Sequence, residues 1–163
     1  AGAVGRLRAT AGPPDRGGVS ALTFVDADEA MRERIGRALG PVAAAHMHLG
    51  NGFTLVALDA DEPVGLLAVV WRALPPPLPD TVEGFIDIIE VRPAWRRRGV
   101  ARQLVALAAA RAGAAGAYQL RAWSSADKME AIPMWRALGF GLCPATTYPR
   151  GESVRGYFVA RPL

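Results

Sequence analysis

The chain has little cysteine and almost no lysine. Cys143 is its only cysteine, so no internal disulfide can form, and a reducing compartment suits the chain. Lys128 is its only lysine, so the net charge of +4 and the isoelectric point near 10.0 come almost entirely from arginine. A basic chain favours an acidic partner; the phosphates of a small molecule would suffice, and nucleic acid is the less favoured interpretation.

The chain also lacks a long hydrophobic run. The apolar stretch at residues 100–115 is interrupted by Arg102 and Arg111, and the N-terminus has no apolar core of a signal peptide. We therefore expect a soluble, cytoplasmic protein without a membrane partner. With 163 residues, 51% of them hydrophobic and 21% charged, the chain suits one globular domain.

Strand-like and helix-like patterns alternate along the chain and predict a mixed α/β (α+β) fold. Residues 1–18 are small and contain several glycines and prolines, which predicts a flexible N-terminal segment before a single domain over residues 19–163. Asp26 or Asp28 is expected to cap the first helix. Strands are expected at residues 19–25, 53–58, 64–71, 84–91, 118–123, 140–143 and 154–160. Helices are expected at residues 27–39, 42–49, 99–112 and 128–138.

Residues 84–110 organise the rest of the chain. A β-branched, apolar run ends at Pro93, three arginines at residues 96–98 and Gly99 follow, and an Ala/Leu/Val pattern with helical spacing then begins. This order predicts a strand, a loop and a helix. The first N–H groups of a helix have no intrahelical partner, and glycine lets a ligand approach the main chain. Such a corner, with arginines beside it, suits a phosphate.

Two segments resemble signatures of the GNAT superfamily of N-acetyltransferases. Residues 91–101, VRPAWRRRGVA, resemble the acetyl-CoA-binding run V-x-P-x-x-[QR]-x-x-G-x-[GA] between the central strand and the next helix. Residues 131–140, AIPMWRALGF, resemble the family's later A-x-x-x-Y-x-x-L-G-F segment. With the flanking strands, the resemblance covers residues 20–163. It implies a mostly antiparallel, twisted sheet that is flanked by helices and split at the end of the central strand, near Val91.

The resemblance also implies which residues hold acetyl-CoA as the cosubstrate. In the family, the main chain at the end of the central strand pairs with the pantetheine arm, and the loop holds the pyrophosphate. Carried over to this sequence, the arm would meet Ile89, Glu90 and Val91, and the pyrophosphate would meet Arg96, Arg97, Arg98, Gly99, Val100, Ala101 and Arg102. Trp135 stands where the family has a tyrosine and would pack along the pantetheine sulfur.

Asp87 is the expected catalytic base. If side chains alternate along the strand, Asp87 shares a face with Ile89 and Val91. Ile86 and Ile88 then lie on the other face. A carboxylate in so apolar a run is costly unless it is paired or opens onto a cleft. Many GNAT sequences carry a polar or acidic residue at this position, facing the acceptor. A structural salt bridge to an arginine is an equally weighted alternative.

The sequence departs from the family at the general acid. The tyrosine that is usually assigned to protonate the leaving thiolate is replaced by Trp135, whose indole N–H donates a hydrogen bond but does not titrate. Water, Tyr148, Tyr157 and Cys143 are alternative proton donors. A domain that binds acyl-CoA and catalyses little is therefore an alternative function.

The two histidines do not predict a metal site. His46 and His48 are two residues apart, which does not place both on one face of a helix, so no metal is expected. The resemblance places them on the acceptor side, where surface histidines are the default interpretation. Cys143 follows an apolar strand start and is expected to be buried.

The sequence thus predicts an acetyl-CoA-dependent N-acetyltransferase in which a primary amine of a small molecule or protein attacks directly. The alternatives are a non-catalytic acyl-CoA-binding module and an acetyltransferase that acts on a nucleic-acid-linked amine. The motifs do not specify which amine is the acceptor, and a homodimer is left open.

Overall fold

The structure is a computed structural model that describes residues 21–78 and 80–163. The flexible segment expected at residues 1–18 lies outside the described residues. The described strands form one sheet in the order β1-β2-β3-β4-β5-β7-β6. Their bounds are β1 Thr23–Asp26, β2 Gly52–Asp59, β3 Glu62–Ala73, β4 Val82–Val91, β5 Gln119–Ser125, β6 Gly141–Thr147 and β7 Val154–Pro162.

Helices connect the strands and flank the sheet. The α-helices are α1 Arg32–Leu39, α2 Pro41–Ala45, α3 Val100–Ala114 and α4 Ala131–Ala137, and the 3₁₀ turns are η1 Glu29–Met31, η2 Pro93–Trp95 and η3 Pro149–Gly151. Among residues 21–78 and 80–163, none of these helices is long and apolar enough to cross a membrane.

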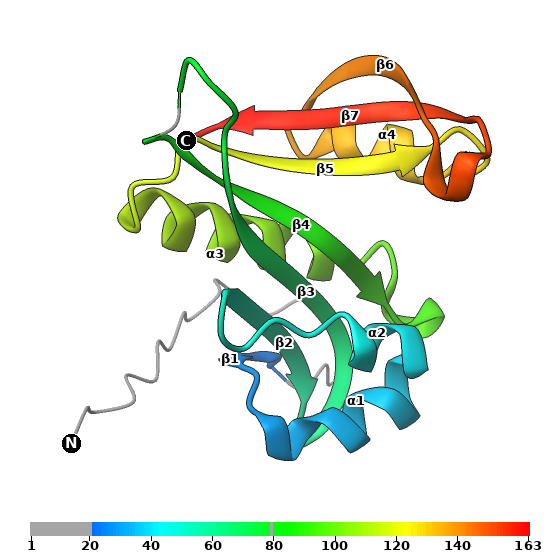
Figure 1. The fold of residues 1–163 in the computed structure, drawn as a ribbon. Coiled ribbons are helices and arrows are strands. Elements are labelled where there is room, and N and C mark those ends of the chain that lie inside the picture. Colours follow the sequence, from blue (N-terminus) through cyan, green and yellow to red (C-terminus); the bar gives the residue numbers. More distant parts are fainter. Residues whose placement is uncertain (1–20, 79) are drawn as a thin grey trace.

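Neighbouring strands are antiparallel, with one parallel pair. Only β4 and β5 run in the same direction, while β1 to β4 form a continuous antiparallel unit and β5, β7 and β6 form another. Figure 1 shows the second unit as an arm that begins beside β4 and then diverges from it. The predicted mixed, mostly antiparallel sheet with flanking helices is confirmed.

The alternation of β2 explains why helices cover both faces of the first unit. Leu55 and Ala57 lie in one core cluster with Leu104 of α3. Val56, between them in the sequence, lies in a second cluster with Ile35 of α1. Successive strand residues point to opposite faces, so both faces of β2 need an apolar cover. Figure 1 shows α1 and α2 on one side of this unit and α3 on the other.

The ends of α1 follow the predicted signals, whereas α2 differs from the prediction. The side chain of Asp28 accepts a hydrogen bond from the Met31 N–H at 3.0 Å, the 3₁₀ turn leads into α1, and Gly40 ends that helix. The next helix, expected at residues 42–49, stops at Ala45. The residues after α2 leave the helix and place two histidines beside β4, as described below.

The strand β6 is longer than predicted. The sequence places its end at Cys143, because Pro144 has no N–H for a strand ladder. In the structure β6 continues to Thr147, and Pro144 pairs with Tyr157 of β7. The sheet order puts β6 at the edge of the described sheet, where a strand can contain proline without losing a bond to a second neighbour.

Candidate functional site

The sheet opens where β4 loses β5 as its partner. The two strands pair from Gly84 with Leu120 to Ile86 with Ala122, and β5 then continues to pair with β7 as far as Ser125. Figure 1 shows β4 and β5 diverging along their length. In the part of the chain that the structure describes, no strand pairs with this edge of β4 beyond Ile86. Its backbone groups can therefore pair with another extended molecule.

Asp87 forms a β-bulge at the start of the opening. Ala68 of β3 pairs with Ile88, and the next residue of β3, Val69, pairs with Ile86. Asp87 is therefore an extra residue in β4. The bulge puts Ile86 in the core cluster on the α3 face and Ile88 against the cluster on the α1 face. The prediction that these two isoleucines share a face is wrong, because strict alternation does not hold across a bulge.

Two histidines converge on the bulged carboxylate. His46 follows the last residue of α2, and His48 precedes β2. His46 Nδ1 and His48 Nε2 each lie 2.8 Å from the same oxygen, Asp87 Oδ2. The side chains of Asp87, His46 and His48 are 24%, 45% and 27% exposed. We call these three residues the carboxylate–imidazole cluster. They replace the salt bridge to an arginine that was the alternative for Asp87.

The carboxylate–imidazole cluster lowers the pKa of Asp87. Burial alone would raise the pKa of this carboxyl, but the hydrogen bonds from His46 and His48, together with their charge, outweigh burial. Asp87 is therefore ionised at neutral pH and is a weaker proton acceptor than an ordinary aspartate. A carboxylate that accepts from one ring nitrogen fixes the tautomer of the imidazole and leaves the other nitrogen to accept a proton.

Before and within the first turn of α3 lies a row of backbone N–H groups that have no backbone acceptor among the described residues. Arg97 and Gly99 adopt left-handed conformations, with φ of 63° and 82°. Gln103 donates to the Gly99 carbonyl at 3.0 Å, but among the described residues no backbone carbonyl accepts from the N–H groups of residues 97–102. Successive N–H groups in such a turn, at the positive end of a helix dipole, form an anion site.

A glycine in β3 lets α3 begin close to the sheet. A Cβ atom at Gly65 would lie 2.8 Å from Val100 Cγ1 and 3.4 Å from Leu104 Cδ1. Gly65 also pairs with Val91, the last residue of β4. Because Gly65 has no side chain, α3 can begin close to the end of β4. The N–H row therefore lies beside the open edge of β4.

The arginines of the loop differ in their contacts. Arg96 turns back to β4, where its Nε donates to the Val91 carbonyl at 3.0 Å and its guanidinium lies 3.3 Å from the Glu90 carboxylate. Arg96 thus fastens the loop to the end of the strand. Arg97 and Arg98 are exposed and surround the N–H row with positive charge.

Trp135 lies in the core. Its side chain is 4% exposed and its ring meets that of Phe140 edge-on, with 4.9 Å between centroids. Pro133 lies near the start of α4, where a helix tolerates proline. The indole therefore packs α4 against the sheet, and its contact with a pantetheine sulfur stays a prediction.

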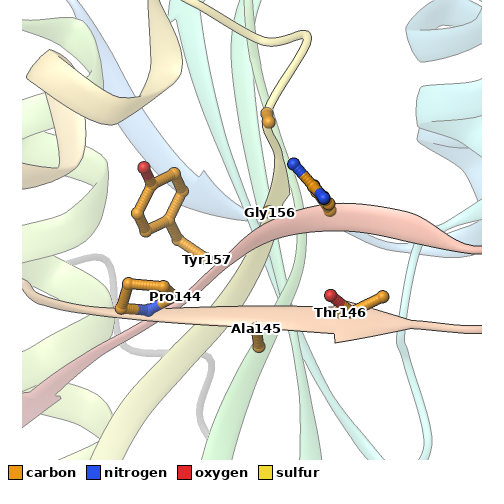
Figure 2. Close-up of a pocket in the computed structure, with 7 residues that line it drawn as sticks. Pro144, Ala145, Thr146, Gly156 and Tyr157 are labelled. Atoms are coloured by element: carbon orange, nitrogen blue, oxygen red, sulfur yellow. The ribbon is translucent and has the colours of Figure 1, made fainter.

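A separate surface pocket lies on the arm that contains β6 and β7. Figure 2 shows its lining, in which the rings of Pro144 and Tyr157 lie on neighbouring strands. Ala126, which follows β5, also lines the pocket. Tyr157 is half-buried there, whereas Tyr148 is 68% exposed. Cys143 is exposed, so its predicted burial is wrong, because β6 lies at the edge of the sheet.

A buried acid on β4 was not predicted from the sequence. Glu83 is 0% exposed, its carboxylate lies 2.6 Å from the guanidinium of Arg121 on β5, and Gln119 donates to it at 2.8 Å. Glu83 and Arg121 form a charge-compensated pair that joins β4 to β5 before the opening. A residue pattern along one strand does not reveal such a pair, because its two members are far apart in sequence.

The open edge of β4 lies between the N–H row and the carboxylate–imidazole cluster, an arrangement that suits an extended anionic ligand beside an acid–base group. The model of the acetyltransferase (GNAT) family matches residues 20–140. The chain belongs to this family.

Solved acetyltransferases share the fold at low identity. Arabidopsis thaliana NAA60 in complex with acetyl-CoA has a TM-score of 0.72 and 13% identity, over 88% of this chain and 100% of that chain. A GNAT acetyltransferase from Streptococcus pneumoniae has a TM-score of 0.67 and 14% identity, with 88% and 100% covered. YncA of Salmonella typhimurium with acetyl-CoA has a TM-score of 0.64 and 18% identity, with 87% and 94% covered. A comparison with curated proteins gives no match.

We predict that Asp87→Asn changes the pH dependence of stability. Because the pKa of Asp87 is lowered on folding, its stabilising effect is present above the ordinary aspartate pKa of about 3.9 and is lost as the pH falls through the lower folded value. Urea denaturation at pH 6 should show the variant less stable by about 1 kcal/mol, with the difference shrinking as the pH falls below about 3.9.

Asp61→Asn, in the exposed turn between β2 and β3, controls for the change of one charge. A difference between the Asp87 variant and the unaltered chain that stays constant from pH 6 to pH 3 would contradict the charged hydrogen bonds of the carboxylate–imidazole cluster.

Proposed function

We propose that this chain is an N-acetyltransferase that transfers an acetyl group from acetyl-CoA to an amine by direct attack. The observation that carries the proposal is one juxtaposition: the unpaired edge of β4 connects an anion site before α3 to the carboxylate–imidazole cluster. One end of this arrangement suits a pyrophosphate, its middle suits an extended arm, and its other end suits proton transfer.

The chain's own groups fit the donor. The N–H groups of residues 97–102 would hold the pyrophosphate, and Arg102 joins the exposed loop arginines in supplying charge. The main chain of residues 89–91 would pair with the pantetheine arm. Gly99 supports this fit, because a Cβ built there meets no atom within 4 Å, so the space above the loop is open. Acetyl-CoA, when bound, supplies an acetyl thioester as the electrophile.

His46 is the base that the geometry favours. When its Nδ1–H donates to Asp87, its Nε2 is left to accept the proton of the attacking amine, and its side chain is the most exposed of the three. Asp87 has a lowered pKa and acts better as the group that orients the imidazole than as the proton acceptor itself. Formation of the new N–C bond breaks the C–S bond, and the proton leaves through His46.

The Val91 N–H is placed to polarise the thioester carbonyl, as the family resemblance implies. It lies at the end of the open edge of β4, beside the helix start that Gly65 admits. Trp135 cannot protonate the thiolate, and we assign that proton to solvent. A non-catalytic acyl-CoA-binding module would share the donor site but would not need an ordered imidazole beside it.

The acceptor is an amine of a small molecule or a protein. Support for this class comes from solved neighbours: the NatC complex is bound to a Gag peptide and CoA, and NAA60 is bound to a bisubstrate analogue. These neighbours, at 15% and 14% identity, guide the choice of amines for an acceptor panel.

We predict that Gly99→Asp removes acetyl-CoA binding, because the new carboxylate would enter the anion site. Gly116→Asp is the matched control: Gly116 follows the other end of α3, has φ of 78° against 82° at Gly99, and also has open space around a Cβ. Both variants strain a left-handed residue by about 1 kcal/mol. Calorimetric titration should show at least about tenfold weaker acetyl-CoA binding for Gly99→Asp alone. Equal affinities in the two variants would remove the donor site from this loop.

We predict that His46→Asn lowers kcat by about 100-fold or more, because the asparagine amide can still donate to Asp87 but cannot accept the amine proton. Acetyl-CoA affinity should not change. His48→Gln retains a donor near the position of Nε2 and should cause a smaller loss. Thiol release, measured with an amine panel across the pH range, checks this. An unaltered kcat in His46→Asn would exclude His46 as the base.

A further inference from the structure

The face of the sheet that carries the carboxylate–imidazole cluster continues into an aromatic floor. Phe85 pairs with Arg121 across β4 and β5, and the Arg121 guanidinium lies 5.6 Å from the Phe85 ring centroid and 4.9 Å from that of Phe158. Trp123 meets Phe158 edge-on at 4.9 Å. The β5 residue between Arg121 and Trp123 lies in the core cluster on the α3 face, so these side chains lie on the opposite face, the one Asp87 shares with α2.

One cation on this floor has no carboxylate partner. The guanidinium of Arg72, on β3, lies 3.5 Å from the ring centroid of Phe85 and is exposed. Arg121 is compensated by the fully buried Glu83. Among the described residues, no carboxylate lies within ion-pair distance of Arg72. The ring below holds the guanidinium in place while its N–H groups stay available to a ligand.

The floor and the carboxylate–imidazole cluster therefore present opposite charges at a short spacing. Phe85, under Arg72, and Asp87 flank a single residue of β4, so the cation lies near the carboxylate–imidazole cluster. The anionic Asp87 favours an ammonium or amine, and the exposed guanidinium of Arg72 favours an anion, for which a carboxylate offers two oxygens to the planar fork.

We infer that the acceptor is an amine that also carries a carboxylate, with the amine beside His46 and the carboxylate on Arg72. This inference rests on the proposed function and specifies its acceptor. A short ω-amino acid, or a peptide N-terminus followed by an acidic side chain, carries both groups.

The test compares amines in pairs that differ by the carboxylate: 5-aminopentanoate with pentylamine, and a peptide beginning Ala-Glu with one beginning Ala-Gln. The unaltered chain should acetylate the carboxylate member of at least one pair with at least about tenfold higher kcat/KM, or about 1.4 kcal/mol. Whichever pair shows the preference identifies the acceptor as a small molecule or a peptide. Equal kcat/KM within both pairs overturns the inference and leaves the proposed function intact.

Arg72→Gln should abolish the preference through a rise in KM for the carboxylate member, and Arg72→Lys should retain part of it because the charge remains. Arg37→Gln is the matched control, since the Arg37 side chain is exposed on α1 and its ion pair with Glu33 is on the surface. Thermal melting verifies that each variant stays folded. A preference that persists in Arg72→Gln overturns the assignment of Arg72. If no amine in the panel releases thiol although acetyl-CoA binds, the proposed function fails and the inference fails with it.

Discussion

Backbone groups in the middle of a sheet need partners, and β4 loses half of its partners after Ile86. The antiparallel pairing with β3 holds one edge of β4 in place, while β5 follows β7 away from the other edge. An extended ligand can complete this edge with the same hydrogen bonds that a strand would make. The position of α3, which Gly65 allows, adds the N–H row at the end of that edge. The proposed donor site thus depends on one interrupted strand pair.

A second irregularity of β4, in its pairing with β3, positions the carboxylate. The bulge in β4 turns Asp87 toward the α1 and α2 side, where the early end of α2 delivers His46 and His48. On the opposite face, β4 residues still pack against α3. One local irregularity therefore separates a core face from a reactive face. The imidazoles also explain how a carboxylate is tolerated in so apolar a strand, because its charge is shared with two donors.

Periodicity and turn residues predicted the sheet, most helices and the loop before α3, since these depend on short-range patterns. They did not predict the bulge, because a period of two assumes no extra residue. They did not predict the carboxylate–imidazole cluster either, because His46 and His48 lie 41 and 39 residues from Asp87 and only tertiary structure unites them. Glu83 was missed for the same reason. The family motifs supply the proposed donor site but do not specify the acceptor.

Amide hydrogen exchange with and without acetyl-CoA tests the central claim, that an unpaired strand edge and the following N–H row hold the donor, most directly. Binding should slow exchange at Ile89, Val91 and residues 97–102, because their N–H groups gain acceptors, while residues 142–147 of β6 should not change. Protection confined to other segments, or no protection at saturating acetyl-CoA, would contradict the account.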